Sequence, residues 1–361
     1  MSEIVLYPSN WLYNAGVIGL LRVLEEPGEQ VEKFIADDGS AHIAITKDAD
    51  QIFKQWTDLS PRSKKGTSLV YGWKDAYYAN QTESSIRKRI NVLVSGDREE
   101  EKVKESAPVF SCAFCTARKK IKKTNATFLN QAFGKILLGS EKSFSNMYWN
   151  NSARDFVCPK CEFILMCHHL ALTRLSDDSE IFINAPSFKV MYYLNRFAQE
   201  AFGVSSSAEA RTKREILAMS VIEYATKIQA TLGVWTGMNI EIVSRRGSEI
   251  EFFSLPHEVI QLLADRRIAS LLSQIGEFSI LNNVLNQDFS RLMELGYRLL
   301  RIGVKPYGER GKPEISFVNE NLRLDKNRQN PQRVAEQIFQ LCAFIEEKRK
   351  RREIYEYIGT T

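Results

Sequence analysis

The chain has few histidines and lacks the short motifs that mark common enzyme sites. Its 361 residues include only four histidines, with no paired-histidine metal motif, no Gly-x-Ser-x-Gly and no Walker loop. The adjacent carboxylates Asp37-Asp38 and Asp177-Asp178 favour turns or caps, because sequence neighbours point apart on regular structure. We therefore expect that this protein is not an enzyme.

A leader sequence and long apolar runs are also lacking. The opening, Met-Ser-Glu-Ile-Val-Leu-Tyr, does not have the basic start and apolar core of a signal peptide. No window reaches the roughly 20 apolar residues that a membrane-spanning helix needs. These absences predict a soluble, cytoplasmic protein with no membrane partner, in a compartment that keeps thiols reduced.

Length and hydrophobic content predict two domains. The chain is 44% hydrophobic, which is ample for packed cores, and it is longer than one typical domain. A serine-rich stretch places the boundary between residues 1–204 and 205–361. The expected fold class is α+β, with an N-terminal mixed α/β domain that carries an inserted four-cysteine zinc-binding site. The C-terminal domain should be a mainly α-helical bundle with one β-hairpin.

Four of the six cysteines form two Cys-x-x-Cys pairs, Cys112/Cys115 and Cys158/Cys161, with 42 residues between the pairs. Two intervening residues let both thiolates of a tight turn face one ion, and two such knuckles supply the tetrahedral set of a structural zinc site. Because four thiolates leave no open position for water, the expected cofactor is a structural Zn²⁺ without catalytic chemistry.

Other interpretations of these cysteines stay open. The pairs could form two disulfides, or the four residues could be unrelated. Cys167, His168 and His169 follow the second knuckle and could compete as ligands, although they lie in a helical pattern from Glu162 to Arg174. The spacing and the reducing compartment favour zinc on the paired cysteines.

The segment from Trp11 to Leu24 is apolar around most of its circumference, which predicts a buried helix capped by Ser9 or Asn10. Gly16 and Gly19 are poor helix formers, and their presence predicts the close approach of another backbone.

Further expectations concern secondary structure elsewhere in the chain. They are a strand at 41–45 paired with 31–35, helices at 256–274 and 278–302, a hairpin of strands 239–243 and 249–253 with Arg245 and Arg246 at its exposed tip, and a long loop at 305–329.

The net charge of +5 is a mild excess that permits a nucleic-acid partner. Basic residues gather in clusters, some with aromatic neighbours, as phosphate contacts and base stacking require. For any one cluster the alternative is a solvated surface. The residues that we expect to bind nucleic acid are Arg62, Lys64, Lys65, Arg87, Lys88, Arg89, Lys119, Lys120, Lys122, Lys123, Arg245 and Arg246.

The opening Tyr7-Pro-Ser-Asn-Trp-Leu-Tyr-Asn-Ala-Gly-Val-Ile-Gly19, the two Cys-x-x-Cys pairs and the helical C-terminal half resemble the CXXC–CXXC family of CRISPR-associated proteins. These are large subunits of the type I-B interference complex, Cascade. The resemblance in sequence covers the N-terminal helix and the zinc region. In the rest of the chain only the expected arrangement of helices is similar. It implies a subunit that contributes to PAM recognition, stabilises the R-loop and recruits a separate helicase–nuclease. The implied partners are crRNA, target DNA, the backbone and crRNA-end-binding subunits, and the helicase–nuclease.

An alternative function is a standalone zinc-ribbon factor that binds nucleic acid without catalysis, for instance in RNA processing. Co-purification distinguishes the two, because a Cascade subunit should be isolated with crRNA and backbone subunits.

Overall fold

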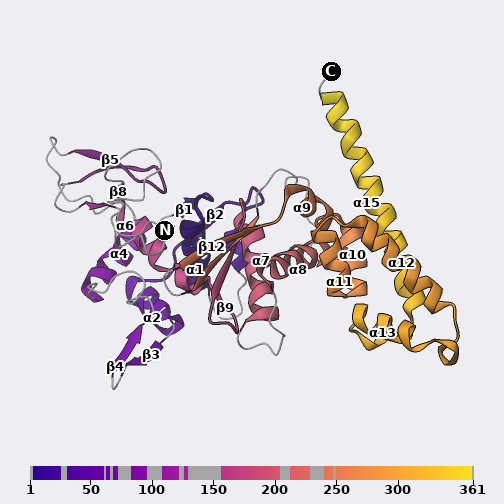
Figure 1. Ribbon diagram of the computed structural model, residues 1–361. Coiled ribbons are helices and arrows are strands. Elements are labelled where there is room, and N and C mark those ends of the chain that lie inside the picture. The colour runs from indigo at the N-terminus through magenta and orange to yellow at the C-terminus, as the bar shows by residue number, and fades with distance from the viewer. Residues whose placement is uncertain are drawn as a thin grey trace. The chain divides into compact units, whose positions relative to one another are not determined.

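A computed structural model of the chain divides into two compact units (Figure 1). Unit 1 comprises Met1–Ala210 and Glu241–Phe253, and unit 2 comprises Arg211–Ile240 and Ser254–Thr361. The residues that the structure describes are 3–25, 31–60, 62–65, 68–71, 83–95, 108–121, 126–128, 156–203, 212–227, 240–246 and 249–359. Among the described residues, no helix is both long and apolar enough to cross a membrane.

Unit 1 combines helices with several small sheets. Its helices are α1 (Trp11–Leu24), η1 (Val31–Phe34), α2 (Ala49–Leu59), α4 (Glu83–Ser95), α6 (Pro159–Met166), η4 (His168–Leu170) and α7 (Phe188–Phe202). Its strands are β1 (Glu3–Leu6), β2 (Ala41–Ala44), β3 (Arg62–Lys65), β4 (Ser68–Tyr71), β5 (Val109–Ser111), β6 (Arg118–Lys120), β7 (Thr127–Phe128), β8 (Phe156–Val157), β9 (Thr173–Arg174), β10 (Glu180–Asn184), β11 (Glu241–Arg246) and β12 (Glu249–Ser254).

Helix α1 forms the centre of unit 1, and its predicted bounds and burial are confirmed. All of its residues except Arg22 are buried, because the apolar side chains surround the axis and leave no solvent face. The Asn10 side chain accepts a hydrogen bond from the Tyr13 amide at 3.0 Å, which caps the first turn. Helix α1 packs against α6 and η4, the segment that follows the second Cys-x-x-Cys pair.

Two strand pairings differ from the sequence expectation. Strand β2 pairs with β1 in an antiparallel register that sets Ile4 opposite Ile43. Residues 31–34 form the short helix η1, so the expected pairing of 31–35 with 41–45 is reduced to one antiparallel bridge between Ile35 and Ala41. Strand β11 pairs with β10 in the four-stranded sheet β12-β11-β10-β9. The hairpin is therefore an extension of the unit 1 sheet, and its expected place in the C-terminal domain is corrected by this long-range pairing.

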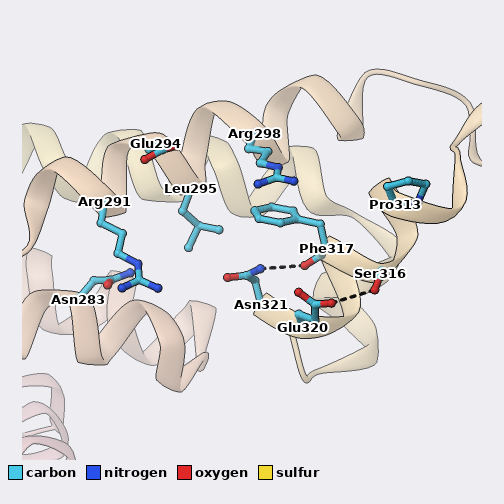
Figure 2. A pocket seen from close by; sticks show the side chains of 10 residues that line it. All are labelled: Asn283, Arg291, Glu294, Leu295, Arg298, Pro313, Ser316, Phe317, Glu320 and Asn321. Carbon is cyan, nitrogen blue, oxygen red and sulfur yellow. Dashed lines mark hydrogen bonds between the residues drawn. The ribbon is translucent and has the colours of Figure 1, made fainter.

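Unit 2 is helical. It contains α8 (Lys213–Lys227), α9 (His257–Leu263), α10 (Arg266–Ile275), α11 (Phe278–Leu285), α12 (Phe289–Gly303), η6 (Tyr307–Glu309), α13 (Lys312–Asn321), α14 (Asp325–Gln329) and α15 (Pro331–Gly359). Helices α11, α12 and α13 border a cavity of about 630 Å³ that is open to solvent (Figure 2).

Three expectations for unit 2 need correction. The helix expected at 278–302 is divided into α11 and α12, because Gln287 adopts a positive φ of 57° and Asp288 caps a new helix. The helix expected at 256–274 is likewise divided into α9 and α10, with Asp265 as the second cap. The loop expected at 305–329 instead contains η6, α13 and α14, since Pro313 occupies the first turn of α13 and starts that helix.

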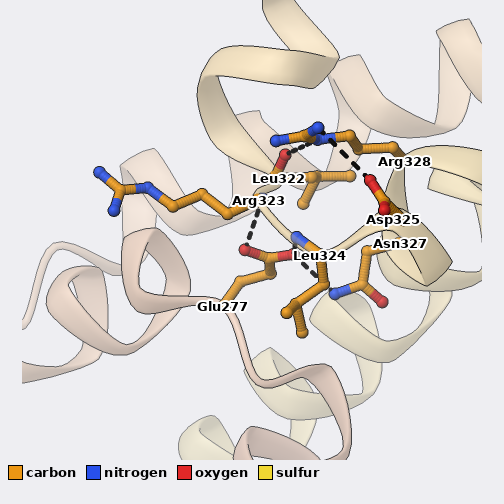
Figure 3. Close-up of polar contacts among 7 residues, drawn as sticks. All are labelled: Glu277, Leu322, Arg323, Leu324, Asp325, Asn327 and Arg328. Atoms are coloured by element: carbon orange, nitrogen blue, oxygen red, sulfur yellow. Dashed lines mark hydrogen bonds and ion pairs between the residues drawn. The ribbon is translucent and has the colours of Figure 1, made fainter. Parts of the chain in front are cut away.

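A buried carboxylate holds the chain between α13 and α14 (Figure 3). Glu277 is only 4% exposed, and it accepts hydrogen bonds from the backbone amides of Arg323 at 2.8 Å and Leu324 at 2.9 Å. It also accepts one from the Asn327 side chain at 2.8 Å. These bonds satisfy the buried charge and fix the turn that the sequence led us to expect as loop.

Candidate metal centre and basic surfaces

The structure brings the four predicted cysteines together. The sulfurs of Cys112, Cys115, Cys158 and Cys161 all lie within 4.8 Å of one another. The first pair occupies the turn between β5 and β6, where the Thr116 amide donates to the Cys112 carbonyl at 3.0 Å. The second pair begins α6: Cys158 is its N-cap, and Cys161 lies in its first turn.

The donor set fits a four-coordinate metal ion. A tetrahedral site with Zn–S bonds of about 2.3 Å places its sulfurs about 3.8 Å apart. The Cys115 and Cys158 sulfurs are 3.7 Å apart, so the two knuckles are already at that spacing. The Cys158 amide also lies 3.4 Å from the Cys112 sulfur, where it would donate to a metal-bound thiolate and stabilise its charge.

The sulfurs also compete for protons. Hydrogen bonds from its neighbours, first of all Cys115, hold the pKa of Cys112 well below its ordinary value. Hydrogen bonding, first of all with Cys112, raises the pKa of the buried Cys161 thiol well above its ordinary value. A bound cation would remove this competition, because it favours the thiolate at all four positions. The chemistry available here is therefore structural metal binding.

Backbone and aromatic contacts join the two knuckles. The Ala113 amide donates to the Phe156 carbonyl at 2.9 Å, which ties the first turn to β8. Beside it the rings of Phe110, Phe128 and Phe156 pack together, with centroid distances of 5.3 Å, 5.6 Å and 6.3 Å. The described residues on either side of the insertion are thus joined by a small hydrophobic cluster as well as by the four clustered cysteines.

Helix α1 supports the second knuckle through the two glycines singled out in the sequence. A Cβ at Gly16 would lie 2.4 Å from the carbonyl oxygen of Ile164, and one at Gly19 would lie 2.0 Å from that of Cys167. Only a glycine lets the backbone of α1 come this close to another backbone, so the predicted contact is confirmed. The partner backbone belongs to α6 and to Cys167, the residue that follows it.

Tyr13 is a site residue that the sequence interpretation missed. Its ring stacks on Phe114 of the first knuckle, with a centroid distance of 5.6 Å and an interplanar angle of 12°. Burial raises the pKa of the Tyr13 hydroxyl well above its ordinary value, and the four cysteines raise it further. Tyr13 lies one helical turn before Gly16, so the two residues share one face of α1. The two glycines could therefore have indicated that Tyr13 lies on the face that meets the cysteine-containing segment.

Cys167, His168 and His169 are not among the clustered ligands. The Cys167 backbone contacts Gly19, and the His168 Nδ1 lies 3.0 Å from the Leu165 carbonyl. The His169 Nε2 lies 2.9 Å from the Ser60 hydroxyl, and burial lowers the pKa of His169 to about 4. All three residues pack in the interior of unit 1 beside α1 and α2.

The predicted basic cluster on α4 is largely engaged within the protein. Arg89 forms an ion pair with Glu162 of α6 at 2.6 Å, and both side chains are mostly buried. Arg87 pairs with Asp50 and Glu83, and its guanidinium lies over the Phe53 ring. Lys88 is exposed. Arg89 therefore links α4 to α6, the helix that begins at the second cysteine pair, and the sequence alone did not indicate this role.

The cluster beside the first knuckle lies on a two-stranded ribbon. Lys119 and Lys120 belong to β6, which pairs with β5 so that Lys119 faces Phe110 and Lys120 faces Val109. Lys120 is exposed and Lys119 is half-buried. Lys122 and Lys123 lie outside the described residues. The ribbon carries its cations next to the cysteine cluster.

The two remaining clusters also lie on strands. Arg62, Lys64 and Lys65 belong to β3, which pairs with β4, and their side chains lie outside the described structure. Arg245 is not at an exposed tip, because it lies opposite Glu180 in the β10–β11 register and forms an ion pair with it. Arg246, the last residue of β11, is exposed.

Comparison with known proteins supports the resemblance seen in the sequence. Residues 105–173 match the family model described as CRISPR-associated protein (Cas_CXXC_CXXC). No curated protein and no solved structure matches the chain. The matched segment contains both knuckles and α6, so it coincides with the metal centre described above. Over residues 105–173 the chain is therefore similar to this CRISPR-associated family.

Proposed function

We propose that this protein is the large subunit of a type I-B Cascade complex, with a structural Zn²⁺ on Cys112, Cys115, Cys158 and Cys161. The observation that carries the proposal is the coincidence of the four-cysteine cluster with the segment matched by the CRISPR-associated family. In this role the subunit binds the crRNA-guided complex and target DNA, contributes to PAM recognition, stabilises the R-loop and recruits the helicase–nuclease. We assign it no catalytic step.

The β5–β6 ribbon is the part of unit 1 best suited to contact DNA. Zinc and the Phe110 cluster would hold it rigidly, so Lys119 and Lys120 could contact phosphates with little loss of conformational freedom. Arg89 and Arg245 are less suited, because both side chains are largely buried and lie against carboxylates of unit 1. Lys88 and Arg246 are exposed and supply further candidate contacts.

The test is reconstitution with the other Cascade subunits, crRNA and PAM-containing target DNA. The wild-type protein should be isolated with crRNA and backbone subunits, and the complex should bind and unwind the target. Reversing the charges of Lys119 and Lys120 should leave assembly intact and weaken DNA binding, with a flatter dependence of affinity on salt because fewer counterions are released. The single reversal Lys120→Glu is compared with Lys54→Glu, a matched control that reverses one exposed lysine of α2 away from the ribbon and the cysteines. If the protein fails to assemble with crRNA and subunits, the proposal is wrong.

A further inference from the structure

Charges of alternating sign lie along α12 where it borders the unit 2 cavity. Arg291, Glu294 and Arg298 are exposed and line this cavity. Their spacing of three and four residues would let them pair on one helix face. Among the residues that the structure describes, however, neither Arg291 nor Glu294 is in an ion pair. Their charges are thus available to a ligand.

The opposite wall of the cavity is ordered by its own contacts (Figure 2). The guanidinium carbon of Arg298 lies 3.9 Å from the centroid of the Phe317 ring. The ring covers one face of the guanidinium and leaves its N–H groups able to donate hydrogen bonds. Glu320 accepts a hydrogen bond from the Ser316 hydroxyl at 2.9 Å, and the Asn321 side chain donates to the Phe317 carbonyl at 2.9 Å. These contacts hold the polar groups of α13 in place before any ligand arrives.

The charge of the lining indicates the kind of ligand. Two arginines and two glutamates line the cavity, so its formal charge is zero. A nucleic acid strand would gain little there, because each phosphate near an arginine would also lie near a carboxylate. A ligand with charges of both signs would be complementary. The cavity of about 630 Å³ is open to solvent, so one face of a partner helix can lie in it while the rest of that helix stays outside.

We propose that this cavity docks a segment of a partner protein that carries a carboxylate, a cation and a second carboxylate in that order. Arg291 and Arg298 are two helical turns apart, which separates their Cα atoms by about 10.5 Å along α12. A partner helix with acidic residues seven positions apart and a basic residue between them presents the complementary pattern. This docking is a function beyond the proposed contacts of the subunit with nucleic acid.

Binding of two synthetic peptides to the full-length protein tests the docking. Both probes are fluorescein-labelled alanine-based helices of roughly 17 residues, long enough to be helical in water. One carries Glu, Lys and Glu at the spacing of Arg291, Glu294 and Arg298, and the other carries Lys, Glu and Lys. Fluorescence anisotropy should show that the wild-type protein binds the first about fivefold more tightly, as expected for several exposed charge pairs.

A charge-swapped variant makes the test specific. Combining Arg291→Glu, Glu294→Arg and Arg298→Glu should reverse the preference between the two peptides. Arg301→Glu changes an exposed arginine of α12 that does not line the cavity, and it should leave the preference as in the wild type. Melting curves by circular dichroism confirm that each variant is folded.

Three results would overturn the docking proposal. The first is equal binding of both peptides, and the second is a charge-swapped variant with the wild-type preference. The third is a labelled oligothymidine strand that binds the wild type and not the charge-swapped variant while neither peptide binds. That last result would assign the cavity to nucleic acid.

Discussion

The contact between Gly19 and the Cys167 carbonyl makes a quantitative prediction about unit 1. A Cβ at this position would lie 2.0 Å from the carbonyl oxygen, so α1 and α6 must separate by 1.0 Å to restore even a 3.0 Å contact. The obstacle is backbone, so no side-chain rotation relieves it. Gly19→Ala should therefore be destabilising although alanine is the better helix former.

The magnitude follows from two opposing effects. Overpacking a dense core costs typically 1–3 kcal/mol, and a backbone clash belongs at the upper end of that range. Replacing a helical glycine by alanine returns about 1 kcal/mol of helix propensity. We expect a net loss of about 2 kcal/mol for Gly19→Ala. With an m-value of about 2 kcal/mol/M in urea, the unfolding midpoint of unit 1 falls by about 1 M.

Urea titrations that follow metal release and tryptophan fluorescence measure this shift. Two units need not unfold in one transition, so metal release serves as the signal specific to unit 1. Gly296→Ala in α12 of unit 2, followed by helical circular dichroism, is the comparison, because it gains the same propensity and its Cβ would meet side chains, those of Ile338 and Phe339 at 3.0 Å, in place of backbone. It should change stability by less than about 1 kcal/mol. An unchanged or higher midpoint for Gly19→Ala would refute the close packing of α1 on α6.

Three further predictions concern the metal, the interior and unit 2. Purified, reduced protein should contain about one zinc per chain by elemental analysis, and Cys158→Ser should lose it and loosen unit 1, because metal-binding energy is folding energy; metal-free wild-type protein would contradict this. The pKa of His169 falls from its ordinary 6.5 to about 4 on folding, so the folded state takes up fewer protons and stability is lost as pH falls from about 6.5 toward 4. His169→Gln removes this titration, so urea melts at several pH values should show a smaller loss of stability in acid than in the wild type, by about 2.5 kcal/mol at pH 4.5. Equal losses in the two proteins would contradict a neutral, buried His169 imidazole. Glu277→Ala should destabilise unit 2 by about 2–4 kcal/mol, because it leaves two backbone amides and one side-chain amide without their acceptor. In melts followed by helical circular dichroism, the control Glu309→Ala, at an exposed position, should change the stability of unit 2 little.

Local chemistry explains which features could be predicted from the sequence. A Cys-x-x-Cys turn brings two thiolates together through its own backbone, so the ligand pairs could be recognised without knowing the fold. The glycines of α1 could be interpreted in the same way, because a poor helix former inside an apolar helix indicates a close neighbour. That neighbour, the carbonyl of Cys167, lies 148 positions further along the chain and could not be identified from the spacing.

The errors have a common physical origin in long-range pairing. The alternation in 239–253 predicted strands correctly, but a strand pattern does not specify its partner, and β11 joined β10 across the intervening α7 and α8. That register also placed Glu180 opposite Arg245 and so turned an expected phosphate contact into an internal ion pair. Gly311 and Pro313 suggested a loop, whereas they start α13 because the missing amide of proline costs nothing in a first helical turn.

Short motifs were enough to predict the clustering of the four cysteines, the buried helix α1 with its glycine contacts, and the resemblance to CRISPR-associated proteins. Which cations stay exposed depends instead on how distant segments pack. Arg89, Arg245 and Lys120 look alike in sequence, yet buried or opposing carboxylates engage the first two and leave the third at the surface. The cavity of unit 2 likewise exists only where α11, α12 and α13 meet, because its lining comes from three helices that must first pack together.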